Sequence, residues 1–212
     1  MINFLFRAIR KFGLLDKIAD YTMQKAKNIE EWEYNLLIQT HAVIEKDVLL
    51  IRKPLIENNQ ANPSRILIKR GSVLNDCQLL IFKHGGEITV GEDSFIGPQS
   101  RIWSASKISI GNRVLISHNV NIHDNNSHDL NANKRHEEFL KIFKTGLPEN
   151  ANYNEKPIVI EDDVWIGFNS TIAKGVTIGK GAIIGHNSFV KSDVPSFAIM
   201  AGNPAVQIGT SN

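Results

Sequence analysis

The sequence predicts an all-β solenoid, in which very short strands separated by tight turns coil around one apolar core. The first observation is a six-residue repeat that runs unbroken through Ile160, Ile166, Ile172, Ile178, Ile184 and Val190. The second is a small or apolar residue four places after each of these, at Val164, Ser170, Val176, Ala182, Ser188 and Val194. A period of six is neither the period of a helix nor strand alternation. Three such units would close one triangular coil of about 18 residues, and the coils would stack about 4.8 Å apart.

The repeat extends upstream with less regularity. The six-residue step recurs in two earlier runs, at Val90, Ile96 and Ile102 and then at Ile110 and Ile116. Before them the step continues without glycines through Ile68, Leu74 and Leu80, so we expect irregular early coils there. The sequence thus predicts a β-helix domain over residues 36–208.

A long insertion interrupts the repeat. The segment VLISHNVNI (114–122) matches VWIGFNSTI (164–172) and places Asn119 over Asn169. The two segments are 50 residues apart. One coil accounts for about 18 of these residues, so about 32 are extra. We therefore predict a long projecting loop at about 123–157, whose middle, 136–143, could form a short helix. A loop of this length inside a compact repeat is usually functional or disordered.

The overall composition argues against several classes of protein. A net charge of +2 over 212 residues does not indicate nucleic-acid binding. The single cysteine, Cys77, allows neither an intrachain disulfide nor a cysteine-based zinc site, and we expect it to be a buried structural residue. Arg7, Arg10 and Lys11 interrupt the N-terminus, which therefore lacks the apolar core of a signal peptide. We expect a cytoplasmic protein.

The first residues form a separate segment. Residues 1–35 are predicted to be helical, and residues 1–27 combine one apolar face with an excess of Lys and Arg over Asp16 and Asp20. A helix here would cap the first coil, because solenoids need their terminal faces covered. The alternative is that the basic amphipathic helix associates weakly with an anionic membrane surface.

The repeat and two motifs resemble a known family. Over residues 88–208, the six-residue pattern, the motif Val164-Trp165-Ile166-Gly167 and the segment Ala201-Gly202-Asn203-Pro204-Ala205 resemble the hexapeptide-repeat acyltransferases, in particular the galactoside and maltose O-acetyltransferases and the xenobiotic acetyltransferases. The resemblance implies a left-handed β-helix and acetyl-CoA as the acyl donor. It also implies a homotrimer whose active sites lie between subunits.

Acyl transfer needs a base that takes the proton of the acceptor, and histidine suits this task near neutral pH. The root of the predicted loop offers His123 and His128, with Asp124 and Asp129 beside them. The family carries a histidine soon after an Asn-Val-x-Ile/Leu strand, and the sequence NVNIHDNNSHDL puts His128 in the matching place. The resemblance therefore implies that His128 is the catalytic base. His123 and Asp124 complete the candidate catalytic set, in which His123 shapes the turn or orients His128. A solvated histidine without a role is the alternative for each.

The resemblance also implies a binding groove for CoA along the coils. The residues concerned are Trp165, Gly167, Phe168, Gly185, His186, Lys191, Ser192 and Pro204. Trp165 would wall the thioester end, Phe168 and His186 would line the pantetheine arm, and Lys191 or Ser192 would lie near the phosphates. The segment around Pro204 would lie near the adenine, although no Lys or Arg follows it in AVQIGTSN, unlike in the family. The glycines are also explained by turn geometry alone.

The expected reaction is direct transfer of an acetyl group from acetyl-CoA to a hydroxyl or amine of a carbohydrate, in surface polysaccharide or lipopolysaccharide biosynthesis. The stretch Ile96-Gly97-Pro98-Gln99 lacks the asparagine with which the sugar acetyltransferases bind their acceptor, which argues against simple galactoside acceptors. The alternatives are an antibiotic or other xenobiotic acceptor, a scaffold without catalytic activity, and a γ-type carbonic anhydrase. The last would place zinc on His118 and His123, but a third protein ligand is not evident and we expect no metal.

Overall fold

The computed structural model describes residues 14–146 and 153–211. The chain divides into two compact units, the first ending at Ile38 and the second beginning at Gln39. Helix α2 (Leu14–His41) confirms the predicted N-terminal helix, and its sequence contains neither glycine nor proline. The part of that prediction that concerns residues 1–13 lies outside the described residues. Within the described ranges, no helix has the length and apolar character needed to cross a membrane.

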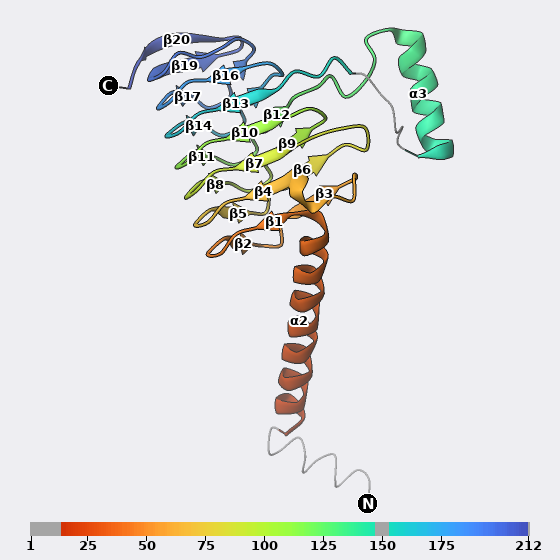
Figure 1. The fold of residues 1–212 in the computed structure, drawn as a ribbon. Helices are drawn as coiled ribbons and strands as arrows, with labels where there is room; N and C mark the ends of the chain where they lie inside the picture. The colour runs from red at the N-terminus through yellow and green to blue at the C-terminus, as the bar shows by residue number, and fades with distance from the viewer. Residues whose placement is uncertain (1–13, 147–152, 212) are drawn as a thin grey trace, which may run out of the picture. The chain divides into compact units, whose positions relative to one another are not determined.

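Three sheets of parallel strands form the second unit (Figure 1). Sheet A holds β1 (Val43–Ile44), β4 (Ile66–Ile68), β7 (Ile88–Val90), β10 (Ile108–Ile110), β13 (Ile158–Ile160) and β16 (Thr177–Ile178). Sheet B holds β2 (Leu49–Ile51), β5 (Val73–Asn75), β8 (Phe95–Ile96), β11 (Leu115–Ile116), β14 (Trp165–Ile166), β17 (Ile183–Ile184), β19 (Ala198–Gly202) and its antiparallel neighbour β20 (Ala205–Thr210). Sheet C holds β3 (Leu55–Asn58), β6 (Gln78–Ile81), β9 (Arg101–Ser104), β12 (Asn121–His123), β15 (Thr171–Ile172) and β18 (Phe189–Val190). A short 3-10 helix, η1 (Pro63–Arg65), precedes β4.

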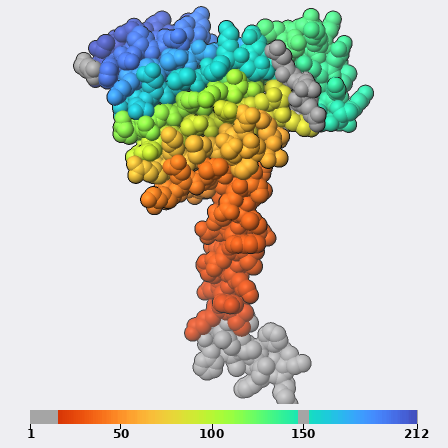
Figure 2. All heavy atoms as spheres, in the orientation of Figure 1, coloured from red at the N-terminus to blue at the C-terminus, as the bar shows by residue number. Residues whose placement is uncertain are grey.

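The chain visits the three sheets in the order A, B, C and then returns to A in the next coil. The sheets are therefore the three sides of a triangular coil, and in Figure 2 the coils of the second unit stack on one another in chain order. This parallel arrangement of six-residue units fits the left-handed β-helix that the resemblance implies. We call the turns between the sheets the A–B, B–C and C–A corners.

The aliphatic residues of the repeat form the core inside the coils. Strand pairing puts Val90, Ile110 and Ile160 of the predicted step in one row of sheet A, and all three side chains are buried. Burying such a side chain stabilises the fold by about 1.5–3 kcal/mol. β-Branched residues suit these short strands because their stiff side chains pack well on a pleated surface. The predicted six-residue step therefore identifies this row of the core correctly.

Ser94 and Ser100 lie four places after a repeat aliphatic and are buried. Their hydroxyls form hydrogen bonds with the backbone of the next coil. The Ser94 hydroxyl donates to the Gly111 carbonyl oxygen at 2.9 Å and accepts from the Val114 amide at 3.0 Å. The Ser100 hydroxyl likewise donates to the Ser117 carbonyl oxygen and accepts from the Val120 amide. Buried polar groups are tolerated only when they are hydrogen-bonded in this way.

The predicted alignment across the insertion is confirmed. Leu115 pairs with Trp165 and Ile122 pairs with Ile172, as the 50-residue offset requires. The Asn119 side chain donates a hydrogen bond to that of Asn169. The segment between β12 and β13 contains helix α3 (Ala132–Thr145), which includes the helix expected at 136–143 and extends it on both sides. The Asn131 side chain caps this helix by accepting from the amides of its first turn.

One detail of the early coils differs from the prediction. Ile68 and Leu74 point into the core as expected, but Leu80 lies on the outer face of sheet C. Its neighbours Leu79 and Ile81 are the fully buried residues. The preceding turn is one residue shorter than the repeat requires, and a shift of one residue turns a strand's side chains to the opposite face. Cys77 lies in this turn, and its burial raises the pKa of the thiol to about 12.

Candidate active site

The insertion, residues 124–157, leaves and rejoins the β-helix at the C–A corner. Its outgoing arm begins directly after β12, and its returning arm leads into β13. Two backbone hydrogen bonds join the arms: the Asn126 amide donates to the Tyr153 carbonyl oxygen at 3.1 Å, and the Lys156 amide donates to the Asp124 carbonyl oxygen at 2.8 Å. The base of the insertion is therefore an ordered part of the corner.

Asp124 fastens the outgoing arm to the coil below. Its side chain is fully buried. One carboxylate oxygen accepts from the Ser104 hydroxyl at 2.7 Å and the Ser106 amide at 2.9 Å, and the other accepts from the Ala105 amide at 2.8 Å. Since these donors occupy both oxygens, the geometry gives Asp124 a structural task at the corner.

His128 follows within the same arm. The side-chain oxygen of Asn125, which is buried, accepts from the Ser127 amide at 2.7 Å, and Ser127 takes a left-handed conformation with φ 62°. Such a tight turn fixes the direction of the chain at the next residue. His128 itself is exposed to solvent, so an acceptor can reach it.

His123 lies at the end of β12 on the outer face of sheet C. Its ring stacks on that of Trp103 with the centroids 4.8 Å apart and the planes 12° apart, and the Trp103 indole donates to the Gln78 side chain at 3.2 Å. Burial lowers the pKa of His123, and the nearby Arg101 lowers it further, against the attraction of Asp124. Its Nε2 atom is buried without a hydrogen-bond partner among the described residues. The stacked rings of His123 and Trp103 therefore lie beside the base of the insertion.

The residues predicted to bind CoA lie mainly on sheet B and the B–C corner. Trp165 stands half exposed on the outer face of sheet B, in a row with Leu115 below it and Ile183 above it. At the B–C corner the Phe168 ring stacks between two histidines, with centroids 5.0 Å from His118 and 4.9 Å from His186.

The glycines of this region are required by close approach of the next coil. A Cβ atom on Gly167 would lie 2.6 Å from the His186 backbone nitrogen, which no side chain tolerates. On Gly185 it would lie 3.2 Å from the Met200 carbonyl oxygen, which is tight but less severe. Turn geometry therefore explains Gly167 fully, whatever the groove binds.

The remaining predicted residues lie in the last coils. Lys191 and Ser192 are exposed at the C–A corner, directly after β18. Pro204 is exposed in the turn between β19 and β20. Within one chain, His123, Asp124 and His128 follow one another at or next to the C–A corner, at the end of β12 and the start of the insertion. The structure does not bring them to Trp165, because sheet B is the side of the triangle opposite the C–A corner.

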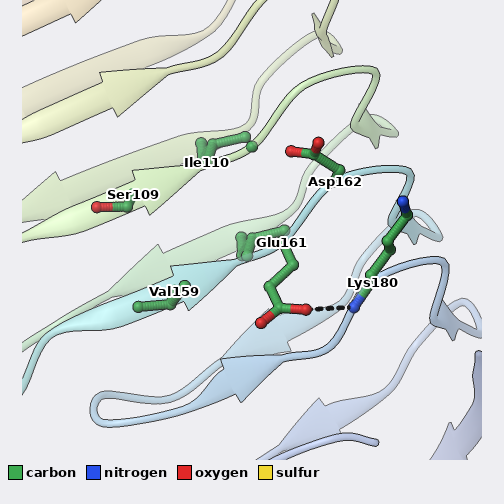
Figure 3. Close-up of a pocket in the computed structure, with 8 residues that line it drawn as sticks. Ser109, Ile110, Val159, Glu161, Asp162 and Lys180 are labelled. Atoms are coloured by element: carbon green, nitrogen blue, oxygen red, sulfur yellow. Dashed lines mark hydrogen bonds between the residues drawn. The ribbon is translucent and has the colours of Figure 1, made fainter. Parts of the chain in front are cut away.

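Two further observations bear on the rival sites. His118 and His123 lie at opposite ends of the β12 segment, one at the B–C corner and the other on sheet C, so they do not converge on one metal ion. An open depression of about 380 Å³ lies over sheet A and the A–B corner, where the Lys180 amide donates to the Glu161 carboxylate (Figure 3). None of the predicted site residues lines it.

Sequence reasoning missed a buried cluster at the C–A corner. The His84 side chain, from the connection between β6 and β7, is 5% exposed and packs between Phe82 and Tyr153. Its Nε2 atom lies 3.6 Å from a carboxylate oxygen of Glu155. Burial lowers the pKa of His84, against the attraction of Glu155 and Asp124. His84 and Tyr153 are outside the repeat and far apart in the sequence, so no periodic signal connects them.

Comparison with known proteins supports the resemblance. The family described as "Bacterial transferase hexapeptide (six repeats)" matches residues 157–192. Galactoside O-acetyltransferase of Escherichia coli (strain K12) is 30% identical over 156 residues, which cover 71% of this chain and 72% of that protein. A 2,3,4,5-tetrahydropyridine-2,6-dicarboxylate N-acetyltransferase of Staphylococcus aureus is 53% identical over 49 residues, but these cover only 23% of this chain and 20% of that protein.

Solved structures share the fold. AntD, an N-acyltransferase from Bacillus cereus in complex with dTDP and 3-hydroxybutyryl-CoA, has a TM-score of 0.66 at 23% identity, covering 85% of this chain and 88% of that one. A hexapeptide-repeat acetyltransferase from Vibrio cholerae in complex with acetyl-CoA has a TM-score of 0.52 at 26% identity, covering 86% and 78%. With the three-sided coil and the relation to galactoside O-acetyltransferase, these likenesses show that the chain belongs to the hexapeptide-repeat acyltransferase family, as an enzyme whose acyl donor is acetyl-CoA.

Proposed function

We propose that this enzyme transfers an acetyl group from acetyl-CoA directly to a hydroxyl or amine of a carbohydrate, with His128 as the general base. The observation that carries the proposal is the position of His128. It is exposed on an arm that the Asp124 carboxylate and the Asn125 turn hold at the C–A corner. Preorganised placement of a base is what proximity catalysis requires.

The chemistry balances without a covalent intermediate. The neutral imidazole of His128 takes the proton of the acceptor O–H or N–H while the acceptor oxygen or nitrogen attacks the thioester carbonyl carbon. The carbon–sulfur bond then breaks, and the imidazolium returns the proton to the departing sulfur of CoA. Cys77 takes no part, because its buried thiol with a raised pKa is not a nucleophile.

The carbohydrate assignment is supported by the relatives. One is named for galactoside O-acetylation, and a second AntD structure contains dTDP-4-amino-4,6-dideoxyglucose and CoA. We therefore propose an activated or polymer-bound sugar as the acceptor, in surface polysaccharide or lipopolysaccharide assembly. We place the reaction in the cytoplasm, where acetyl-CoA is available.

An acetyl-transfer assay is expected to show release of the CoA thiol that depends on both acetyl-CoA and a sugar acceptor. The acceptors are nucleotide-linked sugars and amino sugars, methyl glycosides, and chloramphenicol as a xenobiotic arm. Mass spectrometry identifies the acetylated product and separates O- from N-acetylation. Turnover of chloramphenicol but of no sugar would move the proposal to the xenobiotic class. No thermal shift with saturating acetyl-CoA would contradict the groove assignment.

The proposed site needs two copies of the chain. The insertion that carries His128 is rooted opposite sheet B, which carries Trp165. The outer face of sheet B also presents exposed apolar side chains, among them Leu115 and Trp165 at 52% and 49% exposure. Different patches on opposite sides of one chain fit a head-to-tail contact, which forms a ring when its rotation closes. We propose a homotrimer in which His128 of one copy faces Trp165 of the next.

Co-expression of two variants, each altered in one half of the proposed site, tests this arrangement. His128→Ala and Trp165→Ala chains, carrying different tags, are expected to recover about a quarter of wild-type activity when mixed equally, since a site between copies can draw its two residues from different chains. Light scattering on the purified protein is expected to give the mass of a trimer. Mixed assemblies that stay inactive would place both residues in one chain.

A further inference from the structure

The returning arm of the insertion is supported from an earlier coil by His84. Strand β6, which precedes His84, pairs with β9, and β9 pairs with β12 at the base of the insertion. His84 therefore reaches past one whole coil to contact Tyr153 and Glu155. The ring centroids of His84 and Tyr153 are 5.4 Å apart in an edge-to-face arrangement.

Two glycines after His84 make this reach possible. A Cβ atom on Gly85 would lie 2.3 Å from the Ala105 carbonyl oxygen, and one on Gly86 would lie 2.3 Å from the Ser104 carbonyl oxygen. Gly86 also has a φ of 129°, which L-residues rarely adopt. The backbone beside His84 therefore lies directly against the Ser104–Ala105 segment, which also donates hydrogen bonds to the Asp124 carboxylate.

The contacts continue from His84 to the catalytic arm. Glu155 accepts from the Tyr153 amide at 2.9 Å with the same oxygen that faces His84. The Tyr153 carbonyl oxygen in turn accepts from Asn126, two residues before His128. A continuous set of packed and hydrogen-bonded groups therefore joins His84 to the arm that carries the proposed base.

We propose that His84 is a positioning residue, which through Glu155 and Tyr153 sets the place of the outgoing arm and hence of His128. The inference rests on the proposed function, because it concerns the geometry of that base. His84 is itself 5% exposed and does not touch a substrate. It acts by holding the returning arm where the hydrogen bond to Asn126 forms.

Steady-state kinetics of His84→Ala are expected to show a fall in kcat of about tenfold to 100-fold, since a misplacement of about 1 Å can cost about 100-fold in rate. The KM for acetyl-CoA should change by less than about twofold, because the arm does not carry the cofactor groove. His84→Gln keeps a polar side chain of similar length facing Glu155 and should recover most of kcat. Glu155→Ala should repeat the His84→Ala result, and it carries the test if the latter does not fold.

Leu74→Ala is the matched control, since Leu74 is fully buried in the coil that precedes His84 but in sheet B. It should lower the melting temperature without lowering kcat. The inference is overturned if His84→Ala lowers kcat no more than Leu74→Ala does, or if His84→Gln is no better than His84→Ala.

A His128→Ala enzyme assayed alongside distinguishes failure of this inference from failure of the proposed function. If that variant stays active, the base assignment fails. If it is inactive while the His84 and Glu155 variants retain full kcat, only the role of His84 fails.

Discussion

Replacing His128 with alanine is expected to lower kcat by about 10²–10⁴-fold, the usual contribution of a general base. The KM for acetyl-CoA should change little, because most residues of the groove predicted for the cofactor lie on sheet B and the B–C corner and none lies in the insertion. Stability should be nearly unaffected, since an exposed side chain contributes little to packing. Stopped-flow or steady-state assays of thiol release, together with thermal unfolding, measure all three quantities.

His123→Ala and His136→Ala are the matched controls for this experiment. His123 is stacked on Trp103, so its loss should cost some rate through the shape of the site, whereas His136 on α3 should matter least. If His128→Ala keeps more than about a third of wild-type kcat while one of the controls abolishes it, the base has been assigned to the wrong histidine.

Asp124→Ala is expected to destabilise the fold by about 3 kcal/mol or more, because it leaves several buried donors without an acceptor at about 1–3 kcal/mol each. The donors are the Ala105 and Ser106 amides and the Ser104 hydroxyl. Urea unfolding measures the loss. Activity should fall with it, because the outgoing arm is no longer fastened to the coil.

Asp129→Ala provides the comparison for Asp124. Asp129 is partly exposed and accepts from the Asn131 amide at 2.7 Å, so its loss should cost less than about 1 kcal/mol. The opposite outcome is an Asp124→Ala protein that has the wild-type stability in urea but loses kcat as severely as His128→Ala. In that case the carboxylate acts directly in the chemistry and its structural role is secondary.

The parts of the molecule that follow the repeat could be predicted from the sequence. Ile108 over Ile158 and Leu115 beside Trp165 follow from the six-residue step and the 50-residue offset, because a coil fixes which residues stack. The slip at Leu80 could not be predicted, since it depends on the length of one turn. The support from His84 could not be predicted either. It depends on Gly85 and Gly86, which let the connection after β6 lie close to the next coil. No pattern in the sequence predicts such a contact.

The candidate site likewise contains residues whose place could be predicted from the sequence and residues whose place could not. Trp165 and Phe168 occupy places that their register dictates, and their exposure follows from the outward face of each strand or corner. Asp124, in contrast, was grouped with the histidines because it is their neighbour in the sequence, whereas its carboxylate is taken up by the coil below. Adjacency along a loop says little about which groups face each other, because the loop's path is set by its hydrogen bonds.

The way the coils close around the insertion has a consequence for how such enzymes diversify. Ile108 pairs with Ile88 on one side, 20 residues away, and with Ile158 on the other, 50 residues away. The entropy of closing a chain segment grows only with the logarithm of its length, so the longer closure costs about 1 kcal/mol more than the shorter one. Pairing of the strands offsets this extra cost. Segments of different length and sequence can therefore be exchanged at this corner during evolution without loss of the solenoid.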